Sequence, residues 1–251
     1  MPIQKPLKVM LIAGGDSAER DVSLDSCKSI YEAIVALGHH VVVTDPLHPE
    51  VKPTEDPGVF FDNARIEREP PRHGPERFIA RKDFMKVLND FEILGCDIVF
   101  NGLHGGAGED GTFQAVLDYL GIAYTGSGAA ASMLAMNKRL AKRLVSYNKV
   151  PVAKQLYVEP PAHTNIPDIE NRVMKTPSLP AVVKPNQEGS SVGVTIVRTK
   201  EQRAKAIEEA SAFGGPYLIE EYIDGLESTA ARLVGVEQTD IYICTYSVFY
   251  D

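Results

Sequence analysis

The sequence predicts an α/β protein in two parts, an N-terminal parallel-sheet domain followed by a smaller α+β module. Apolar strand-type runs alternate with helix-type spacing over roughly the first 135 residues, an order typical of helices packed on a parallel sheet. After Pro151 the pattern changes to pairs of strands with one helix. The third observation is a turn rich in Gly and Ser over residues 184–193, which opens on a lysine and joins two strand-type runs.

The parallel-sheet part is expected to begin with a buried strand over residues 7–13, because that run is apolar throughout. Helix-type spacing follows and ends near Gly38. The later elements expected in this part are a strand over 41–44, a helix near 84–88, a strand over 97–100, a helix over 113–120, a short strand over 122–124 and a helix over 129–147. Residues 45–80 are rich in Pro, Gly and charge, so we interpret them as a long surface excursion.

In the second part, the expected elements are strands over 181–183 and 194–197, a helix over 201–212 and a strand over 217–223. We interpret 217–223 as an edge strand that runs into a turn at Asp224-Gly225. Free backbone groups on such an edge can read an adenine, and Glu227 just beyond can accept hydrogen bonds from ribose hydroxyls. A plain edge strand explains the same residues.

The bulk composition narrows the class of partner. A net charge of −8 and a pI near 5.3 argue against a nucleic-acid partner. No apolar run is long enough to span a bilayer, and no cleavable signal pattern opens the chain. Cys27, Cys96 and Cys244 lie far apart without the spacing of a metal site, so we expect a reduced, cytoplasmic setting.

Two short motifs match sequence patterns of proteins with other functions. Residues 126–131 match the G-x-G-x-x-A pattern of dinucleotide-binding proteins, but Asn148 and Lys149 stand where an acidic residue is expected. A tight strand–helix turn is the alternative. Residues 189–193 match the G-x-S-x-G pattern of serine hydrolases, which need a helix after the serine and a histidine downstream. The next residues are β-branched and the last histidine is His163, which disfavours a hydrolase.

The turn over 184–193 is a candidate phosphate site, because freed backbone N–H groups wrap an anion and Lys184 adds a positive charge. Asn137-Lys138 is a second candidate, on the predicted helix over 129–147. The apolar side of that helix is expected to carry Met133, Met136, Leu140 and Leu144. Its basic residues, Lys138, Arg139, Lys142 and Arg143, are also typical of a solvated face.

Together these motifs resemble the D-alanine–D-alanine ligases of the ATP-grasp superfamily, over nearly the whole chain apart from residues 45–80. The resemblance is carried by residues 14–23 (GGDSAERDVS), 103–111 (LHGGAGEDG), 124–128 (YTGSG), 137–138 (NK), 183–185 (VKP) and 188–193 (EGSSVG). It implies a Rossmann-like, pre-ATP-grasp domain over 1–136, a central ATP-grasp subdomain over 137–220 and the incomplete start of a C-terminal subdomain over 221–251, with a further strand over 241–249.

The resemblance also implies residues for the amino-acid substrate. Glu19 is similar to the carboxylate that holds the ammonium group of the first D-alanine and orients Ser190, which makes Glu19 and Ser190 the implied catalytic pair. Val22 and His104 are similar to the walls of the same subsite.

The nucleotide site is implied in the same way. Lys138 and Lys184 are similar to the two lysines that grip the ATP phosphates, and Ser190 and Ser191 lie on the lid loop. The residues that match the adenine and ribose contacts are Glu220, Tyr222, Ile223 and Glu227. Glu221 stands where the family often has a lysine, and Asn137 replaces a frequent aspartate.

The implied activity is ATP-dependent ligation of two D-alanines for peptidoglycan precursor synthesis, through an acyl phosphate, with ATP and Mg²⁺ as cofactors. Family members continue past residue 251, and their magnesium ligands and substrate lid lie in that continuation. We therefore expect a truncated ligase that is inactive alone. The alternative is a non-catalytic protein, derived from the ligase, that binds ATP or an amino acid. Members of the family are usually homodimers.

Overall fold

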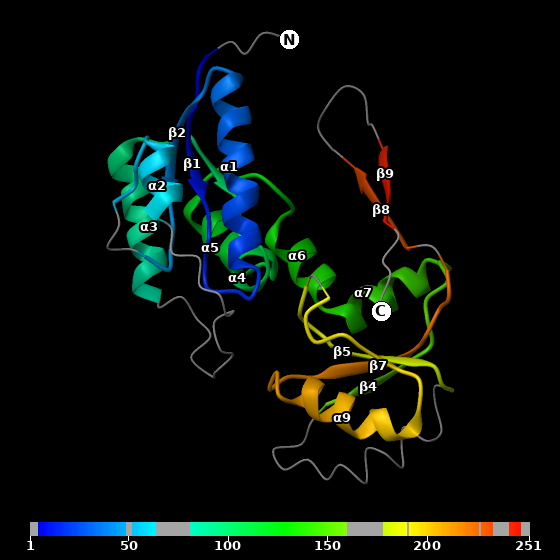
Figure 1. The fold of residues 1–251 in the computed structure, drawn as a ribbon. Helices are drawn as coiled ribbons and strands as arrows, with labels where there is room; N and C mark the ends of the chain where they lie inside the picture. The colour runs from blue at the N-terminus through cyan, green and yellow to red at the C-terminus, as the bar shows by residue number, and fades with distance from the viewer. Residues whose placement is uncertain are drawn as a thin grey trace.

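The computed structural model describes residues 5–48, 52–63, 81–159, 178–189, 191–225, 227–232 and 241–246. These residues form a parallel sheet, an antiparallel sheet and a separate two-stranded ladder (Figure 1). The prediction of a parallel-sheet α/β part followed by an α+β part is confirmed.

The first sheet is parallel, has the order β2-β1-β3, and consists of β1 (Lys8–Ile12), β2 (His40–Thr44) and β3 (Ile98–Asn101). In its register, Val9 of β1 lies opposite Val41 of β2 and Ile98 of β3. Both faces of β1 are covered, since Met10 and Leu11 point to opposite faces and are both fully buried. Burial on both faces explains the uninterrupted apolar run.

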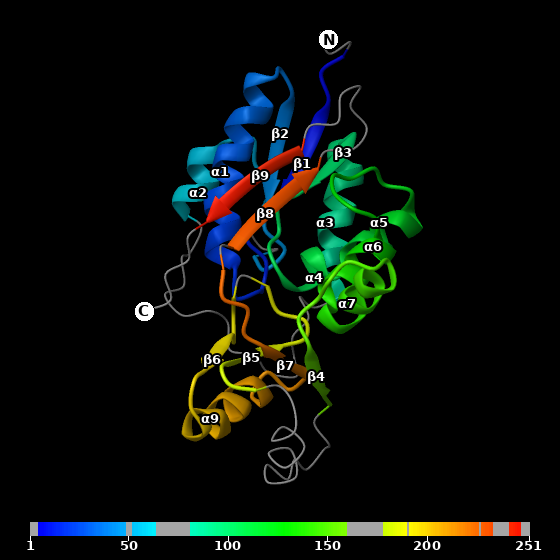
Figure 2. The same cartoon turned by 90° about the vertical axis from the view of Figure 1, so that its right-hand side faces the viewer.

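Five helices accompany this sheet: α1 (Arg20–Ala36), α2 (Pro57–Asn63), α3 (Arg81–Leu94), α4 (Gly106–Glu109) and α5 (Thr112–Leu120). One core cluster contains Leu11 with Leu24 of α1 and Phe60 of α2. The other contains Met10 with Leu88 of α3 and Phe113 of α5. Helices therefore cover both faces (Figure 2).

The excursion expected over residues 45–80 contains a helix that its composition did not predict. The Asp56 carboxylate accepts hydrogen bonds from the backbone N–H groups of Gly58 and Val59, which caps α2 at its N-terminus. Phe60 then packs into the core with 5% of its surface exposed. Residues 64–80 lie outside the described residues.

The single helix expected over 129–147 is wrong, because the chain breaks at Asn137 into α6 (Ala129–Met136) and α7 (Lys138–Tyr147). Asn137 has an extended ψ of 95°, and its side chain accepts a hydrogen bond from the backbone N–H of Leu140. An asparagine that caps a helix in this way starts a new one. The short strand expected over 122–124 is likewise reduced to a single parallel bridge between Val99 and Tyr124.

The second sheet is antiparallel, has the order β4-β7-β5-β6, and consists of β4 (Gln155–Val158), β5 (Ala181–Pro185), β6 (Thr195–Val197) and β7 (Tyr217–Glu221). Helix α9 (Lys200–Ser211) packs on one face through Ala206, Ile207 and Ala210. The expectation of an edge strand at 217–223 is wrong, because β7 pairs with β4 on one side and β5 on the other.

The last described strands, β8 (Glu227–Arg232) and β9 (Ile241–Tyr246), form an antiparallel ladder that stands apart from both sheets in Figure 1. Helices α6 and α7 lie between the two sheets in both views. Among the helices that the structure describes, none has the length and apolar character needed to cross a membrane.

Candidate functional site

The N-terminus of α1 places Glu19 beside the loop that follows β3. Glu19 is the residue directly before α1 and is 6% exposed. Its backbone N–H donates to Ser17 Oγ at 3.1 Å, and the Ser17 hydroxyl donates in turn to the carbonyl of His104. Ser17 therefore fixes the distance between the two segments that carry Glu19 and His104.

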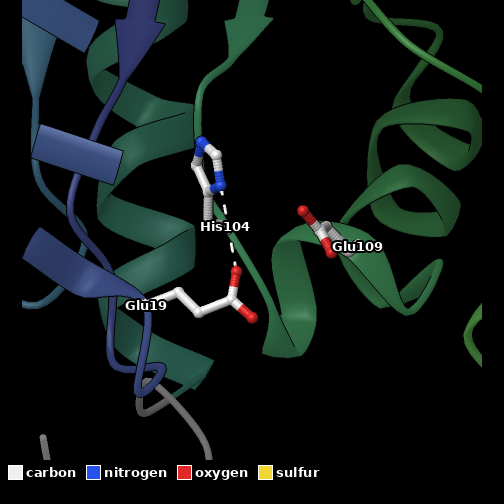
Figure 3. Close-up of side chains that lie close together, drawn as sticks. All are labelled: Glu19, His104 and Glu109. Carbon is white, nitrogen blue, oxygen red and sulfur yellow. Dashed lines mark ion pairs between the residues drawn. The ribbon is translucent and has the colours of Figure 1, made fainter. Parts of the chain in front are cut away.

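Three side chains point toward one another at this place (Figure 3). His104 Nδ1 lies 3.9 Å from Glu19 Oε2, an ion pair when the imidazole is protonated. Glu109, at the end of α4, completes a group whose ligand atoms all lie within 4.8 Å of one another. Two carboxylates and an imidazole at this spacing fit a cation, either a metal ion or the ammonium group of an amino acid.

The pKa of Glu109 reflects the burial and the charges of this group. Burial is the largest effect and raises the pKa of its carboxyl above the ordinary value, although the backbone N–H of Gly105 opposes the rise. The nearby charge of Glu19 raises the pKa further, and His104 lowers it. Two carboxylates that repel each other in this way favour a positively charged ligand between them.

A buried ion pair stabilises the start of α1. Arg20 Nη2 lies 2.6 Å from Asp45 Oδ2, and both side chains are at most 4% exposed. Arg20 Nη1 also donates to the carbonyl of Gly15, and Asp45 Oδ1 accepts from the N–H of Gly15. These contacts hold the glycine turn after β1 in place, and they thereby fix the position of Glu19 at the start of α1.

The loop between β5 and β6 reaches this group from the second sheet. A Cβ atom on Gly189 would lie 2.6 Å from Glu19 Oε1, so only a glycine admits the carboxylate at this distance. Ser191 follows with a φ of 60°, and residues 191–193 form a turn that leads into β6. No helix follows Ser191, so the structure lacks the strand–turn–helix that a hydrolase nucleophile requires.

A second charged cluster lies at the ends of β5 and β7. Glu220, on β7, has a side chain that is 5% exposed, and its Oε2 lies 2.8 Å from Lys184 Nζ on β5. Its Oε1 lies 2.6 Å from Lys142 Nζ on α7. The buried carboxylate of Glu220 therefore pairs with two lysines, so the three side chains together carry a net positive charge.

Lys138 belongs to the same cluster. Its ammonium donates to the carbonyl of Glu188 on the loop between β5 and β6. Burial lowers the pKa of Lys138, and the like charge of Lys184 lowers it further, against the opposing charges of Glu188 and Glu220. Lys138 and Lys184 are therefore close enough to repel each other, and an anion between them would relieve that repulsion.

Helix α7 presents Lys138, Arg139 and Lys142 to the second sheet and its loop, so the interpretation of its basic residues as a solvated face is wrong for these three, while Arg143 is exposed. Arg139 lies 3.9 Å over the ring of Tyr157, and the Lys142 side chain is only 19% exposed. The side expected to be apolar and packed is the exposed one, with Leu140 41% and Leu144 51% exposed. Glu220 on β7 and the aromatic ring of Tyr157 on β4 determine which side of the helix is packed.

A cavity of about 670 Å³ lies between Glu109 of the carboxylate group and Lys138 of the lysine cluster. Glu109 lines it from the first domain, Lys138 from α7 and Gly189 from the loop between β5 and β6. Glu109 and Lys138, which the sequence places far apart, therefore face one common space.

The other residues predicted from the resemblance are placed as follows. Val22 lies in the first turn of α1 and is 49% exposed. Tyr222 follows β7 and donates its backbone N–H to the carbonyl of Pro180, while Ile223 is 65% exposed. Glu227 begins β8, but its side chain and the whole of Ser190 lie outside the described residues. The roles of all five residues stay predictions.

Three residues of the site were missed by sequence reasoning. Asn186 accepts hydrogen bonds from the backbone N–H groups of Lys138 and Arg139, and so attaches α7 to the end of β5. Lys142 lies four residues after Lys138, a spacing that puts both on one side of a helix. Glu109 stands in a quoted motif, but its approach to Glu19 depends on tertiary structure.

Comparison with known proteins gives two family matches. Residues 8–127 match the model described as the D-ala D-ala ligase N-terminus. Residues 144–250 match the model described as the D-ala D-ala ligase C-terminus. The two matched segments contain the carboxylate group and, from the lysine cluster, Lys184 and Glu220, whereas Lys138 and Lys142 lie between them.

Curated relatives agree with these matches. A D-alanine–D-alanine ligase of Halalkalibacterium halodurans is 38% identical over 227 residues, which is 90% of this chain and 61% of the relative. One of Gluconobacter oxydans is 34% identical over 250 residues, 98% of this chain and 68% of the relative. The chain thus spans about three fifths of the length of the first of these relatives.

Solved structures show the same fold. The D-alanine–D-alanine ligase of Coxiella burnetii has a TM-score of 0.68 at 23% identity, with 94% of this chain and 69% of that chain covered. The Helicobacter pylori enzyme has a TM-score of 0.69 at 22% identity, with 94% and 70% covered.

Proposed function

Because the chain belongs to the D-alanine–D-alanine ligase family, we propose that its two charged groups bind D-alanine and ATP for the ligation of two D-alanines. The reaction passes through an acyl phosphate of the first D-alanine, which the amine of the second attacks, and it serves peptidoglycan precursor synthesis. The observation that carries the proposal is the contact of Gly189 with Glu19, since it brings the loop that follows Lys184 onto the carboxylate of the first domain.

The carboxylate group fits the amino acid. Glu19 and Glu109 carry negative charge toward one space, where an ammonium group would be neutralised, and His104 flanks Glu19 at 3.9 Å. An amino acid anchored there through its ammonium group directs its carboxylate away from Glu19 and Glu109. The loop that carries Gly189 is placed to bring the terminal phosphate of ATP toward that carboxylate.

The lysine cluster fits the phosphates. Lys138 and Lys184 repel each other, and the glycine-containing loop that follows Lys184 is expected to add backbone N–H groups as donors. Catalysis of phosphoryl transfer depends mainly on positioning and on neutralisation of charge, so no nucleophilic side chain is needed. Lys138 and Lys184 would neutralise the phosphates, and Glu19 would hold the acceptor in line.

Magnesium, the ion that the family's reaction implies, does not fit the lysine cluster as it stands. Glu220 is the buried carboxylate of that cluster, and Lys142 and Lys184 already neutralise it at 2.6 and 2.8 Å. We therefore assign no magnesium ligand in this cluster, and we assign Glu19, His104 and Glu109 to the ammonium group of D-alanine, so no step here is derived through the metal.

Isothermal titration of the purified 251-residue chain tests the proposal. We expect a non-hydrolysable ATP analogue to bind, and D-alanine to bind in its presence in preference to L-alanine. Glu19→Gln is expected to abolish D-alanine binding while nucleotide binding is kept. Phosphate release with ATP, magnesium and D-alanine then separates a ligase from a binding protein. Failure of the ATP analogue to bind would overturn the proposal. The homodimer implied by the family is tested separately by light scattering.

A further inference from the structure

We propose that Lys142 is a positioning residue of the nucleotide site: it is the permanent counter-ion of Glu220, which frees Lys184 to leave Glu220 and bind a phosphate. The inference rests on the proposed binding of ATP. It assigns to Lys142 a role that neither the motifs nor the family matches gave it.

The two carboxylate oxygens of Glu220 contact different lysines. Oε2 faces Lys184 at 2.8 Å, and Oε1 faces Lys142 at 2.6 Å. Oε1 is buried and no group of the described chain meets it with hydrogen-bond geometry, so the ion pair with Lys142 is the contact that compensates its charge. The three side chains come from three different elements, β7, α7 and β5, which fixes the triad within the fold.

Glu220 needs two lysine partners because one of them is expected to leave it when a nucleotide binds. Lys184 is predicted to bind a phosphate, and to do so it must exchange the Glu220 carboxylate for the phosphate oxygens. A buried carboxylate that loses its single counter-ion is strongly destabilised. With Lys142 on the other oxygen, Glu220 keeps one positive partner throughout the exchange.

Other groups around Glu220 do not replace Lys142. Lys138 lies in the same cluster, but its ammonium is engaged by the carbonyl of Glu188. On the β4 side, Gln155 lies opposite Glu220 in the strand register and carries no charge. On the β5 side, Val182 is opposite and apolar. Lys184, the lysine that would leave, is therefore the group for which Lys142 compensates.

A neighbouring ion pair provides the matched control. Glu221, the next residue on β7, pairs with Lys154 Nζ at 3.9 Å, and the Lys154 side chain is 79% exposed. That pair has the same chemistry but is solvated, so Lys154→Met is expected to leave nucleotide binding unchanged.

The test measures binding of a non-hydrolysable ATP analogue by calorimetry in buffers of different ionisation enthalpy. Lys142→Met is expected to weaken binding about tenfold or more and to add the uptake of roughly one proton, because Glu220 loses its remaining counter-ion when Lys184 moves. Binding to this variant therefore becomes tighter as the pH falls. Lys142→Arg keeps the charge and is expected to behave like the wild type. Unchanged affinity without proton uptake in Lys142→Met would overturn the inference.

Two further measurements cover the remaining outcomes. If Lys142→Met does not fold, Glu220→Gln is compared with the double variant Glu220→Gln/Lys142→Met, since a neutral residue 220 makes Lys142 dispensable. Equal affinities support the role, and a further loss in the double variant contradicts it.

If the wild type binds no nucleotide, the proposed function fails, but acylation of Lys184, followed by mass spectrometry, still tests whether Lys142 is the second counter-ion of Glu220. In Lys142→Met, Glu220 depends on Lys184 alone, so Lys184 is expected to react several-fold more slowly than in the wild type or in Lys154→Met. An unchanged rate would overturn the inference.

Discussion

Gly189 lies so close to Glu19 that a single added carbon atom would stand 2.6 Å from the Glu19 carboxylate. Glu19 belongs to the start of α1 in the first domain, and Gly189 belongs to the loop between two strands of the second sheet. The contact therefore joins the carboxylate group to the loop beside the lysine cluster. The proposed reaction requires that these two groups meet.

Gly189→Ala is expected to impair function more than folding. The atom that the new methyl group meets is the end of a flexible side chain, so Glu19 moves away at little cost in stability. Binding of D-alanine is expected to weaken by about tenfold or more, because the displaced carboxylate no longer faces the ligand. Calorimetry measures the binding and urea unfolding the stability. Gly215→Ala, with no atom within 4 Å of the added carbon, is the control. Equal D-alanine affinity in both variants would contradict the role of the contact.

Arg20→Met is expected to destabilise the chain by about 3–5 kcal/mol, because it leaves the buried Asp45 carboxylate without a counter-ion. Lys205→Met removes an exposed ion pair of 3.6 Å with Glu209 and is expected to cost less than about 0.5 kcal/mol. Urea unfolding gives both values. A loss in Arg20→Met as small as that in the control would show that the Gly15 turn does not depend on this pair.

Glu19→Gln is expected to lower the pKa of Glu109, since it removes the negative charge that raises it, while the larger effect of burial remains. A raised carboxyl pKa means that the folded state binds the proton more tightly than the unfolded state. Ionisation of Glu109 therefore costs stability as the pH rises above its ordinary value of 4.5. Because the residue is more than a third exposed, that cost is small. NMR titration of the labelled carboxyl carbon measures the pKa, and no downward shift in Glu19→Gln would contradict the proximity.

Cys27 is expected to resist thiol reagents in the folded protein. Burial raises the pKa of its thiol to about 12, so almost no thiolate forms at pH 8. Cys96 is only partly buried, and burial raises the pKa of its thiol as well, but it is accessible to reagent. Alkylation followed by mass spectrometry is expected to modify Cys96 before Cys27. Modification of Cys27 at the rate of Cys96 would contradict the packing of α1 on the first sheet.

Local pattern was enough to predict most of the architecture. The apolar run of β1 predicts a doubly covered strand, and Gly121 ends α5 in the left-handed conformation that glycine favours. The break at Asn137 was missed because residues 129–147 contain no proline or glycine, and the apolar pattern continues through the capping asparagine. The interior position of β7 was missed because strand order depends on pairing between distant segments.

The residues of the site were likewise only partly predictable from the sequence. Lys184 and Glu19 stand in motifs that can be recognised without a structure. The partnership of Lys142 with Glu220 cannot be recognised there, because it depends on which side of α7 packs against β7. A basic helix side has the same sequence pattern in solvent as against a buried carboxylate. Only the tertiary structure distinguishes the two.

The dependence of ATP binding on the two lysines tests the central claim most directly. The affinity of a fluorescent ATP analogue is measured for the wild type, Lys138→Met, Lys184→Met and the exposed control Lys205→Met. We predict submillimolar binding by the wild type, a loss of about tenfold or more in each of the first two variants, and no change in the control. Equal affinity in all four proteins, or no binding by the wild type, would contradict the assignment of this cluster to the phosphates.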